Sequence, residues 1–143
     1  MTPGVSPGDG RTLLVVDDDQ PFRTRIVKAF RDRGLIVSDA GTYDGACARA
    51  RDESPELALV DLQLGGRSGI ELVNALKTLD PTTRIVVLTG YGSIATAVES
   101  LKLGATSYLT KPADADQVLA AFDGASPDPS HGVPQTPSLA RVE

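Results

Sequence analysis

The sequence predicts an α/β fold in which a doubly wound, five-stranded parallel sheet is covered by helices on both faces. Two observations predict it. Five short apolar runs, each too short for a helix, alternate with segments of helical periodicity. The runs are apolar at nearly every position, as expected of strands buried on both faces. Right-handed crossovers between such units give a doubly wound sheet, whose ligands bind at the carboxyl ends of the strands.

The first unit has a strand at 12–16 and a helix after it. Pro21 suits the first turn of that helix, Asp19 is a candidate N-cap, and Gly34 ends the helix. Apolar side chains at helical spacing give it one buried face: Phe22, Ile26 and Phe30.

The second unit has a strand at 35–37 and a helix over 43–53. The small residues expected on the inner face of this helix are Ala46, Cys47 and Ala50. The third unit begins with a strand at 57–60, which ends in Asp61. A helix through Leu79 follows, and its start at 68–71, Ser-Gly-Ile-Glu, matches a capping box.

The fourth strand is expected at 84–88 and the fifth at 107–110. Between them lies a helix that Gly104 closes. The apolar residues expected to line that helix are Ile94, Val98 and Leu101. Asp114 and Gln117 start a last helix, which ends near residue 122. The expected arrangement is a flavodoxin-like (βα)5 fold with strand order 2-1-3-4-5.

Length and composition restrict the class of protein. A chain of 143 residues with a net charge of −5 favours one domain and argues against a nucleic-acid-binding surface. The single cysteine and single histidine argue against a disulfide framework, a cysteine-cluster metal site and histidine catalysis. No apolar run approaches the roughly 20 residues of a membrane helix. We therefore expect a cytoplasmic domain without direct membrane contact.

The boundaries of the domain follow from proline and glycine content. Residues 1–10 are rich in both and are expected to be disordered. The dense pattern over 11–124 is expected to fold. Residues 125–143 are rich in proline and are expected to form an extended linker.

Aspartates, a threonine and a lysine–proline pair stand just after four of the five strands: Asp17, Asp18, Asp19, Asp61, Thr89, Lys111 and Pro112. Carboxylates that converge raise one another's pKa unless a cation lies among them. Oxygen ligands without histidine or cysteine select Mg²⁺ or Mn²⁺. A lysine and a threonine can hold phosphoryl oxygens, and a carboxylate can itself accept a phosphoryl group. The set fits phosphoryl transfer onto an aspartate.

Each of these residues also has an ordinary structural interpretation. Asp19 is expected simply to cap a helix, and Asp61 alone could form a turn. Tyr108 could serve only for packing, and Ser38-Asp39, after the second strand, shows no pattern. The functional interpretation depends on four strand ends carrying suitable residues together.

Over about 12–122 the chain resembles the receiver domain of two-component response regulators. The resemblance is carried by four runs: LLVVDDD at 13–19, LALVDLQLGGRSGIEL at 57–72, VVLTGYG at 86–92 and SYLTKP at 107–112. It implies a domain that catalyses only its own phosphorylation and dephosphorylation, with a sensor histidine kinase as the phosphoryl donor. Many receivers carry a Met-Pro pair after the acceptor, whereas this chain has Leu62-Gln63-Leu64-Gly65-Gly66.

The resemblance also implies a role for each residue at the site. Asp61 is the implied phosphoacceptor. Asp17, Asp18, Asp61 and the backbone carbonyl of Gln63 are the implied ligands of Mg²⁺ or Mn²⁺.

The remaining implied roles concern the phosphoryl group and the switch. Lys111 would bind phosphate, and its peptide bond to Pro112 would be cis. Thr89 would move towards the phosphoryl group and Tyr108 would turn inward. The face made by the fourth helix, fifth strand and last helix would then change.

Further runs resemble one group of receivers, the RegA/PrrA/ActR-type global redox regulators. They are DLQLGGRSG, TGYGSIATAV, LKLGA and KPADAD. In that group a proline hinge joins the receiver to a DNA-binding domain. The resemblance implies transcription regulation, contact with DNA only through a domain missing from this chain, and possible homodimerisation on phosphorylation.

Three alternatives remain open. An FMN-binding flavodoxin has the same fold, but Asp17–Asp19 stand where its phosphate loop would be. A haloacid-dehalogenase-type phosphatase also uses an aspartate nucleophile, but in its pattern a Gly-Thr pair follows the acidic run closely, and none does here. A stand-alone single-domain receiver that acts by docking a partner protein is the third.

Overall fold

Five parallel strands form the central sheet of the computed structural model, in the order β2-β1-β3-β6-β7. The structure describes residues 10–90 and 93–123. The expected linker at 125–143, and the expected lead-in apart from Gly10, lie outside these ranges. Along the chain the elements are β1 (Thr12–Val16), α1 (Gln20–Asp32), β2 (Ile36–Ala40), α2 (Tyr43–Glu53), β3 (Leu57–Asp61), β4 (Gln63–Leu64), β5 (Arg67–Ser68), α3 (Gly69–Leu79), β6 (Arg84–Thr89), α4 (Ile94–Lys102), β7 (Ser107–Thr110) and α5 (Ala115–Phe122).

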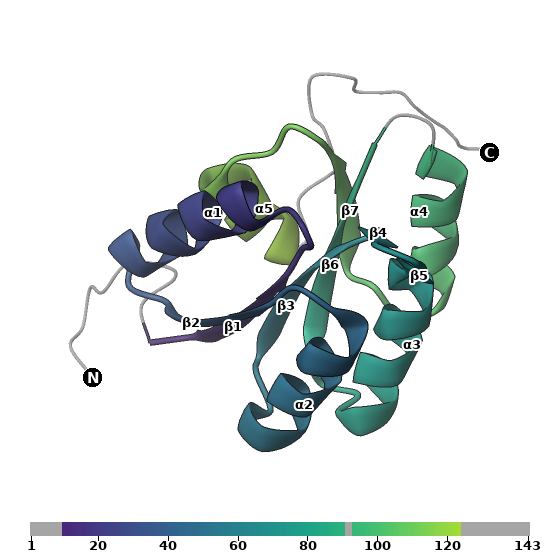
Figure 1. Ribbon diagram of the computed structural model, residues 1–143, viewed down its shortest axis with the longest axis horizontal. Helices are drawn as coiled ribbons and strands as arrows, with labels where there is room; N and C mark the ends of the chain where they lie inside the picture. The colour runs from purple at the N-terminus through teal and green to yellow at the C-terminus, as the bar shows by residue number, and fades with distance from the viewer. Residues whose placement is uncertain (1–9, 91–92, 124–143) are drawn as a thin grey trace.

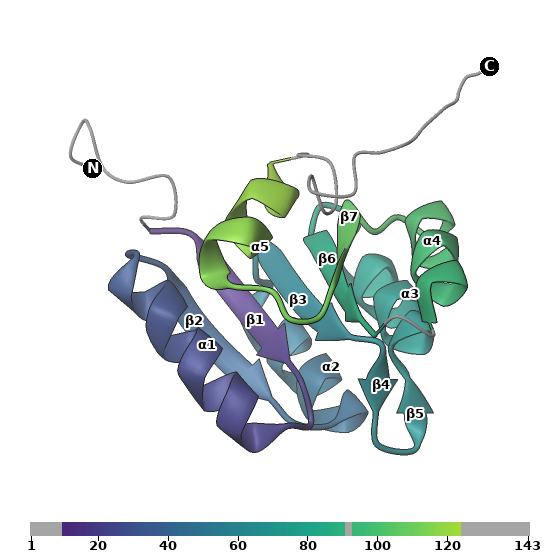
Figure 2. The ribbon, with the colours of Figure 1, turned by 90° about the horizontal axis from the view of Figure 1, so that it is seen from above.

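Helices cover both faces of the sheet, with α1 and α5 on one side and α2, α3 and α4 on the other (Figures 1 and 2). Along β1, Leu13 and Val15 pack under α1 and α5, whereas Leu14 and Val16 pack under the other three helices. Both sides of the strand are buried, and for this reason it is apolar at every central position. The predicted doubly wound fold is confirmed. Its predicted strand order 2-1-3-4-5 is confirmed as well, because β6 and β7 are the fourth and fifth strands of the central sheet.

The strand order places the ends of β1 and β3 side by side. The two strands pair in register, with Val16 opposite Val60. The next residue of each chain segment is an aspartate, Asp17 after β1 and Asp61 at the end of β3. Parallel pairing therefore brings two acids together that the sequence separates widely.

Local capping agrees with the sequence in two helices and differs in a third. Asp19 accepts the Phe22 N–H at 3.1 Å and caps α1. Asp114 and Gln117 form the predicted capping box of α5. The capping box predicted at 68–71 is wrong, because the Glu71 side chain pairs at 3.1 Å with Arg67 four residues earlier.

Two strands differ from prediction. β2 continues beyond residue 37, because its parallel pairing with β1 extends to Ala40, which lies opposite Val16. Backbone hydrogen bonds make this pairing, so the polar side chains of Ser38 and Asp39 do not end the strand. No strand is predicted between the third strand and the third helix, but the segment after β3 forms the short antiparallel hairpin β4–β5, drawn beside the end of β3 in Figure 2. Gly65 turns the hairpin with a φ of 62°.

The apolar line predicted on α4 faces outward. The helix buries its small residues Ala97 and Ser100, which allow it to lie close to the sheet. Ile94, Val98 and Leu101 are each at least 36% exposed. Among the residues that the structure describes, no helix is long and apolar enough to cross a membrane.

Candidate functional site

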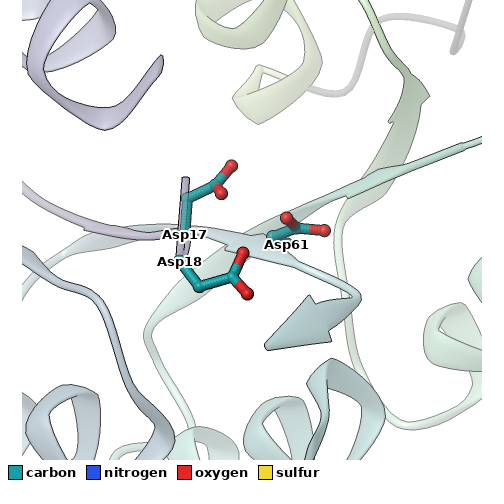
Figure 3. Close-up of side chains that lie close together, drawn as sticks. All are labelled: Asp17, Asp18 and Asp61. Atoms are coloured by element: carbon teal, nitrogen blue, oxygen red, sulfur yellow. The ribbon is translucent and has the colours of Figure 1, made fainter. Parts of the chain in front are cut away.

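Three carboxylates meet where β1 and β3 end. Asp17 and Asp18 follow β1, and Asp61 is the last residue of β3 (Figure 3). One oxygen from each lies within 4.8 Å of the others. The convergence expected from the strand ends is therefore present for all three acids.

Asp17 is the most buried acid of the cluster, with 1% of its surface exposed. Its Oδ1 accepts the backbone N–H of Asp19 at 2.9 Å. Its Oδ2 is buried and accepts no hydrogen bond from the residues described. Burial raises the pKa of Asp17 to about 6; the Asp19 N–H opposes this rise, and the charge of Asp61 adds to it.

Lys111 brings a positive charge to the two buried acids. Its Nζ donates to Oδ2 of Asp61 at 2.9 Å and lies 3.5 Å from Oδ2 of Asp17. The ammonium group also lies 5.6 Å from the centre of the Phe22 ring. Burial lowers the pKa of Lys111, but the hydrogen bond and charge of Asp61 outweigh burial and leave that pKa above its ordinary value.

Backbone N–H groups of the β4–β5 hairpin hold one oxygen of Asp61 and one of Asp18. The Gln63 N–H donates to Oδ1 of Asp61 at 3.0 Å, and the Gly65 N–H donates to Oδ2 of Asp18 at 2.9 Å. Sequence reasoning missed this backbone contribution. The adjacent glycines Gly65 and Gly66 were the available indication of a tight turn there.

The residues of the implied switch lie on β6 and β7. Thr89 ends β6, is 1% exposed, and donates its hydroxyl to the Gly90 carbonyl at 3.1 Å. Tyr108 on β7 is half-buried against the core beneath α2, α3 and α4. The Lys111–Pro112 peptide bond is cis.

The cluster fits a hard divalent cation. Its ligand atoms are all oxygens, which Mg²⁺ and Mn²⁺ prefer. Oδ2 of Asp17 is buried and accepts no hydrogen bond from the described residues, although it lies in ion-pair range of Lys111 at 3.5 Å. A cation at this point would satisfy that oxygen and offset the repulsion among the acids.

The chain belongs to the response regulator receiver domain family, because the family model of that description matches residues 13–123. It is 48% identical over 115 residues to the photosynthetic apparatus regulatory protein RegA of Cereibacter sphaeroides, covering 80% of this chain and 62% of RegA. It is 46% identical to the acid tolerance regulatory protein ActR of Sinorhizobium medicae, covering 80% of this chain and 59% of ActR. These relatives confirm the predicted likeness to the RegA and ActR group. The chain spans about three fifths of their length.

A solved structure supports the same family. It is that of a response regulator from Burkholderia pseudomallei with a phosphorylated aspartic acid, a calcium ion and citrate. The match is 44% identical with a TM-score of 0.75, and it covers 78% of this chain and 66% of that chain.

Proposed function

We propose that this domain accepts a phosphoryl group on Asp61 from a sensor histidine kinase, in a reaction that requires Mg²⁺ or Mn²⁺. The observation that carries the proposal is the meeting of Asp61 with Lys111 and two further acids at the carboxyl ends of the strands. Such a site supplies a nucleophile, a cation for phosphoryl oxygens and a place for a metal. The phosphorylated aspartic acid and calcium ion in the Burkholderia pseudomallei structure support this reading.

The transfer step uses one carboxylate oxygen of Asp61. That oxygen attacks phosphorus, an O–P bond forms, and the N–P bond to the donor imidazole breaks. Lys111 is placed to donate a hydrogen bond to a phosphoryl oxygen and to stabilise its negative charge, because Nζ already contacts Oδ2 of Asp61 at 2.9 Å. The Thr89 hydroxyl can donate to a second phosphoryl oxygen after leaving the Gly90 carbonyl.

The metal would be held by Asp17, Asp18, Asp61 and the backbone carbonyl of Gln63. When bound, it supplies positive charge to the phosphoryl oxygens and lowers the cost of bringing them beside the acids. The buried Oδ2 of Asp17, which accepts no hydrogen bond from the described residues, supports this assignment from the protein side.

The output of the domain would be a change in the face formed by α4, β7 and α5. Movement of Thr89 would free space beneath α4, and Tyr108, already half-buried there, would turn into it. The exposed side chains of Ile94, Val98 and Leu101 lie on the helix that would respond. That face would then bind a second copy of the domain or release an output domain.

We further propose that 11–124 is a cytoplasmic receiver and that 125–143 is a linker to a DNA-binding domain that controls transcription. The likeness to RegA and ActR, both named as regulatory proteins and both longer than the matched region, supports this reading.

The test is the intact mass of the protein after incubation with acetyl phosphate and Mg²⁺. Wild type and Asp52→Asn, which alters an exposed acid on α2, should each gain one phosphoryl group. Asp61→Asn and wild type in EDTA should gain none. Labelling of Asp61→Asn at the wild-type rate would refute the acceptor assignment. Failure of wild type with acetyl phosphate, phosphoramidate and a phosphorylated histidine kinase would refute the function.

A further inference from the structure

Arg23 connects three elements next to the acidic cluster. It lies on α1, and its Nε donates to Oδ2 of Asp39 on β2 at 2.7 Å. Its Nη1 donates to the backbone carbonyl of Asp17 at 2.6 Å, at the end of β1. The side chain of Arg23 is only 17% exposed. Asp39, which showed no pattern in the sequence, therefore has a partner at the site.

These contacts hold the main chain of Asp17 from both sides. Its N–H donates to the Ala40 carbonyl at 3.2 Å, and its carbonyl accepts from Arg23. A guanidinium group is suited to this task because its planar fork makes two bonds in fixed directions at once. Asp39 holds one arm of the fork, so the other arm is aimed at Asp17.

Gly41 provides the space for the guanidinium group. A Cβ atom at position 41 would lie 2.8 Å from Nη1 of Arg23, the same nitrogen that donates to Asp17. The backbone of Gly41 is outside the left-handed region, so alanine is allowed there conformationally. The atom in the way is the far end of a flexible side chain, so alanine would displace the Arg23 guanidinium and leave the backbone in place.

We propose that Arg23, anchored by Asp39 and admitted by Gly41, is a positioning residue that fixes Asp17 in its metal-binding place. Arg23 touches neither the metal position nor the phosphoryl group. It acts through the carbonyl of Asp17, whose side chain must converge with the other acids. This inference rests on the proposed metal site. Groups that orient metal ligands typically change metal affinity by roughly 10- to 100-fold when removed.

The experiment measures Mn²⁺ affinity by the loss of the free Mn²⁺ signal in electron paramagnetic resonance. The proteins are wild type, Arg23→Ala, Gly41→Ala and the double variant. The matched control is Arg25→Ala, because Arg25 is an exposed arginine on the same helix. Urea unfolding of each protein separates loss of affinity from loss of fold.

We expect Arg23→Ala and Gly41→Ala each to weaken Mn²⁺ binding roughly tenfold, and Arg25→Ala to bind as wild type. The double variant should bind like Arg23→Ala alone, because alanine at 41 has no guanidinium left to displace. Gly41→Ala should lose affinity while keeping a cooperative urea transition, because only the hydrogen bonds of the displaced guanidinium are lost. The rate of labelling by acetyl phosphate should recover in both single variants at saturating Mn²⁺.

The results distinguish this inference from the proposed function. If wild type itself binds no Mn²⁺ at millimolar concentration, the proposed metal site is refuted and the positioning role is refuted with it. If wild type binds and both single variants bind equally well, only the positioning role is refuted. Additive losses in the double variant would also refute it, since they would show that the two positions act separately.

Discussion

Nζ of Lys111 lies 2.9 Å from Oδ2 of Asp61, although 50 residues separate them in the sequence. The contact exists because Asp61 ends β3, Lys111 follows β7, and β6 lies between these two strands. The same Nζ lies 3.5 Å from Asp17. A single cation therefore offsets two buried carboxylates in the metal-free protein.

Removing that cation should destabilise the metal-free protein. We expect Lys111→Met to lower the free energy of unfolding at neutral pH by about 1–2 kcal/mol, because Asp17 and Asp61 are left to repel each other in a buried place. Urea denaturation in EDTA measures the change. Lys28→Met is the control, since Lys28 makes an exposed pair with Asp32 on α1. Equal losses in the two variants would contradict the role of Lys111.

The raised pKa of Asp17 predicts a pH dependence of stability in the absence of metal. Its pKa is about 6 in the folded protein and 3.8 ordinarily, so the folded state holds this proton more tightly. The resulting stabilisation is complete below pH 3.8 and is lost as the pH rises through about 6. Wild type should therefore lose roughly 1–3 kcal/mol from this group on passing to neutral pH.

Asp17→Asn isolates this effect. The variant cannot ionise at position 17, so its free energy of unfolding should rise relative to wild type as the pH increases from about 4 to about 7. The pKa values of Asp80 and Asp116 are lowered in the folded protein, so these two groups add to the free energy of unfolding as the pH rises. Wild type and Asp17→Asn both contain them, so their contribution cancels in the difference between the two proteins. Urea denaturation at several pH values in EDTA gives the difference. A difference independent of pH would contradict the raised pKa.

Gly69 is required where α3 passes the end of β3. A Cβ atom there would lie 2.6 Å from Cα of Leu62, and closer still to the carbonyl oxygen of Asp61. Both obstacles are backbone, so Gly69→Ala should cost more than about 3 kcal/mol and disturb the proposed phosphorylation of Asp61. Gly66→Ala is the control, because a Cβ there meets nothing within 4 Å. Circular dichroism during urea unfolding should show the variant at 66 close to wild type and the variant at 69 far below it.

Gly65 is required for a different reason, its backbone conformation. Its φ of 62° lies in the left-handed region, and its N–H holds Oδ2 of Asp18. Gly65→Ala should destabilise the protein by about 1 kcal/mol, because L-residues other than glycine are strained there. Gly65→Asn should lose less, since asparagine tolerates this conformation better. Thermal unfolding compares the two, and an equal loss would indicate that strain is not the cause.

Local patterns were sufficient to predict most of the fold. Asp19 caps α1 and Asp114 with Gln117 caps α5, because these bonds join residues that are near neighbours in the chain. Strands apolar on both faces identified the parallel sheet, and the polar residues after them identified Asp17, Asp61 and Lys111 as neighbours. Each of these predictions needed only short-range periodicity and the rule that parallel strands end at one edge.

Other features depend on which segments meet in space. Arg67 draws Glu71 away from the capping box, and α4 buries Ala97 and Ser100 while its larger apolar residues face outward. Asp39 has a partner only because α1 begins near the ends of β1 and β2, at a distance that Arg23 can span. The sequence determines the periodicity and the chemical groups. The packing distances between elements decide which of those groups become partners, because a hydrogen bond needs its two atoms within about 3 Å and an ion pair needs them within about 4 Å.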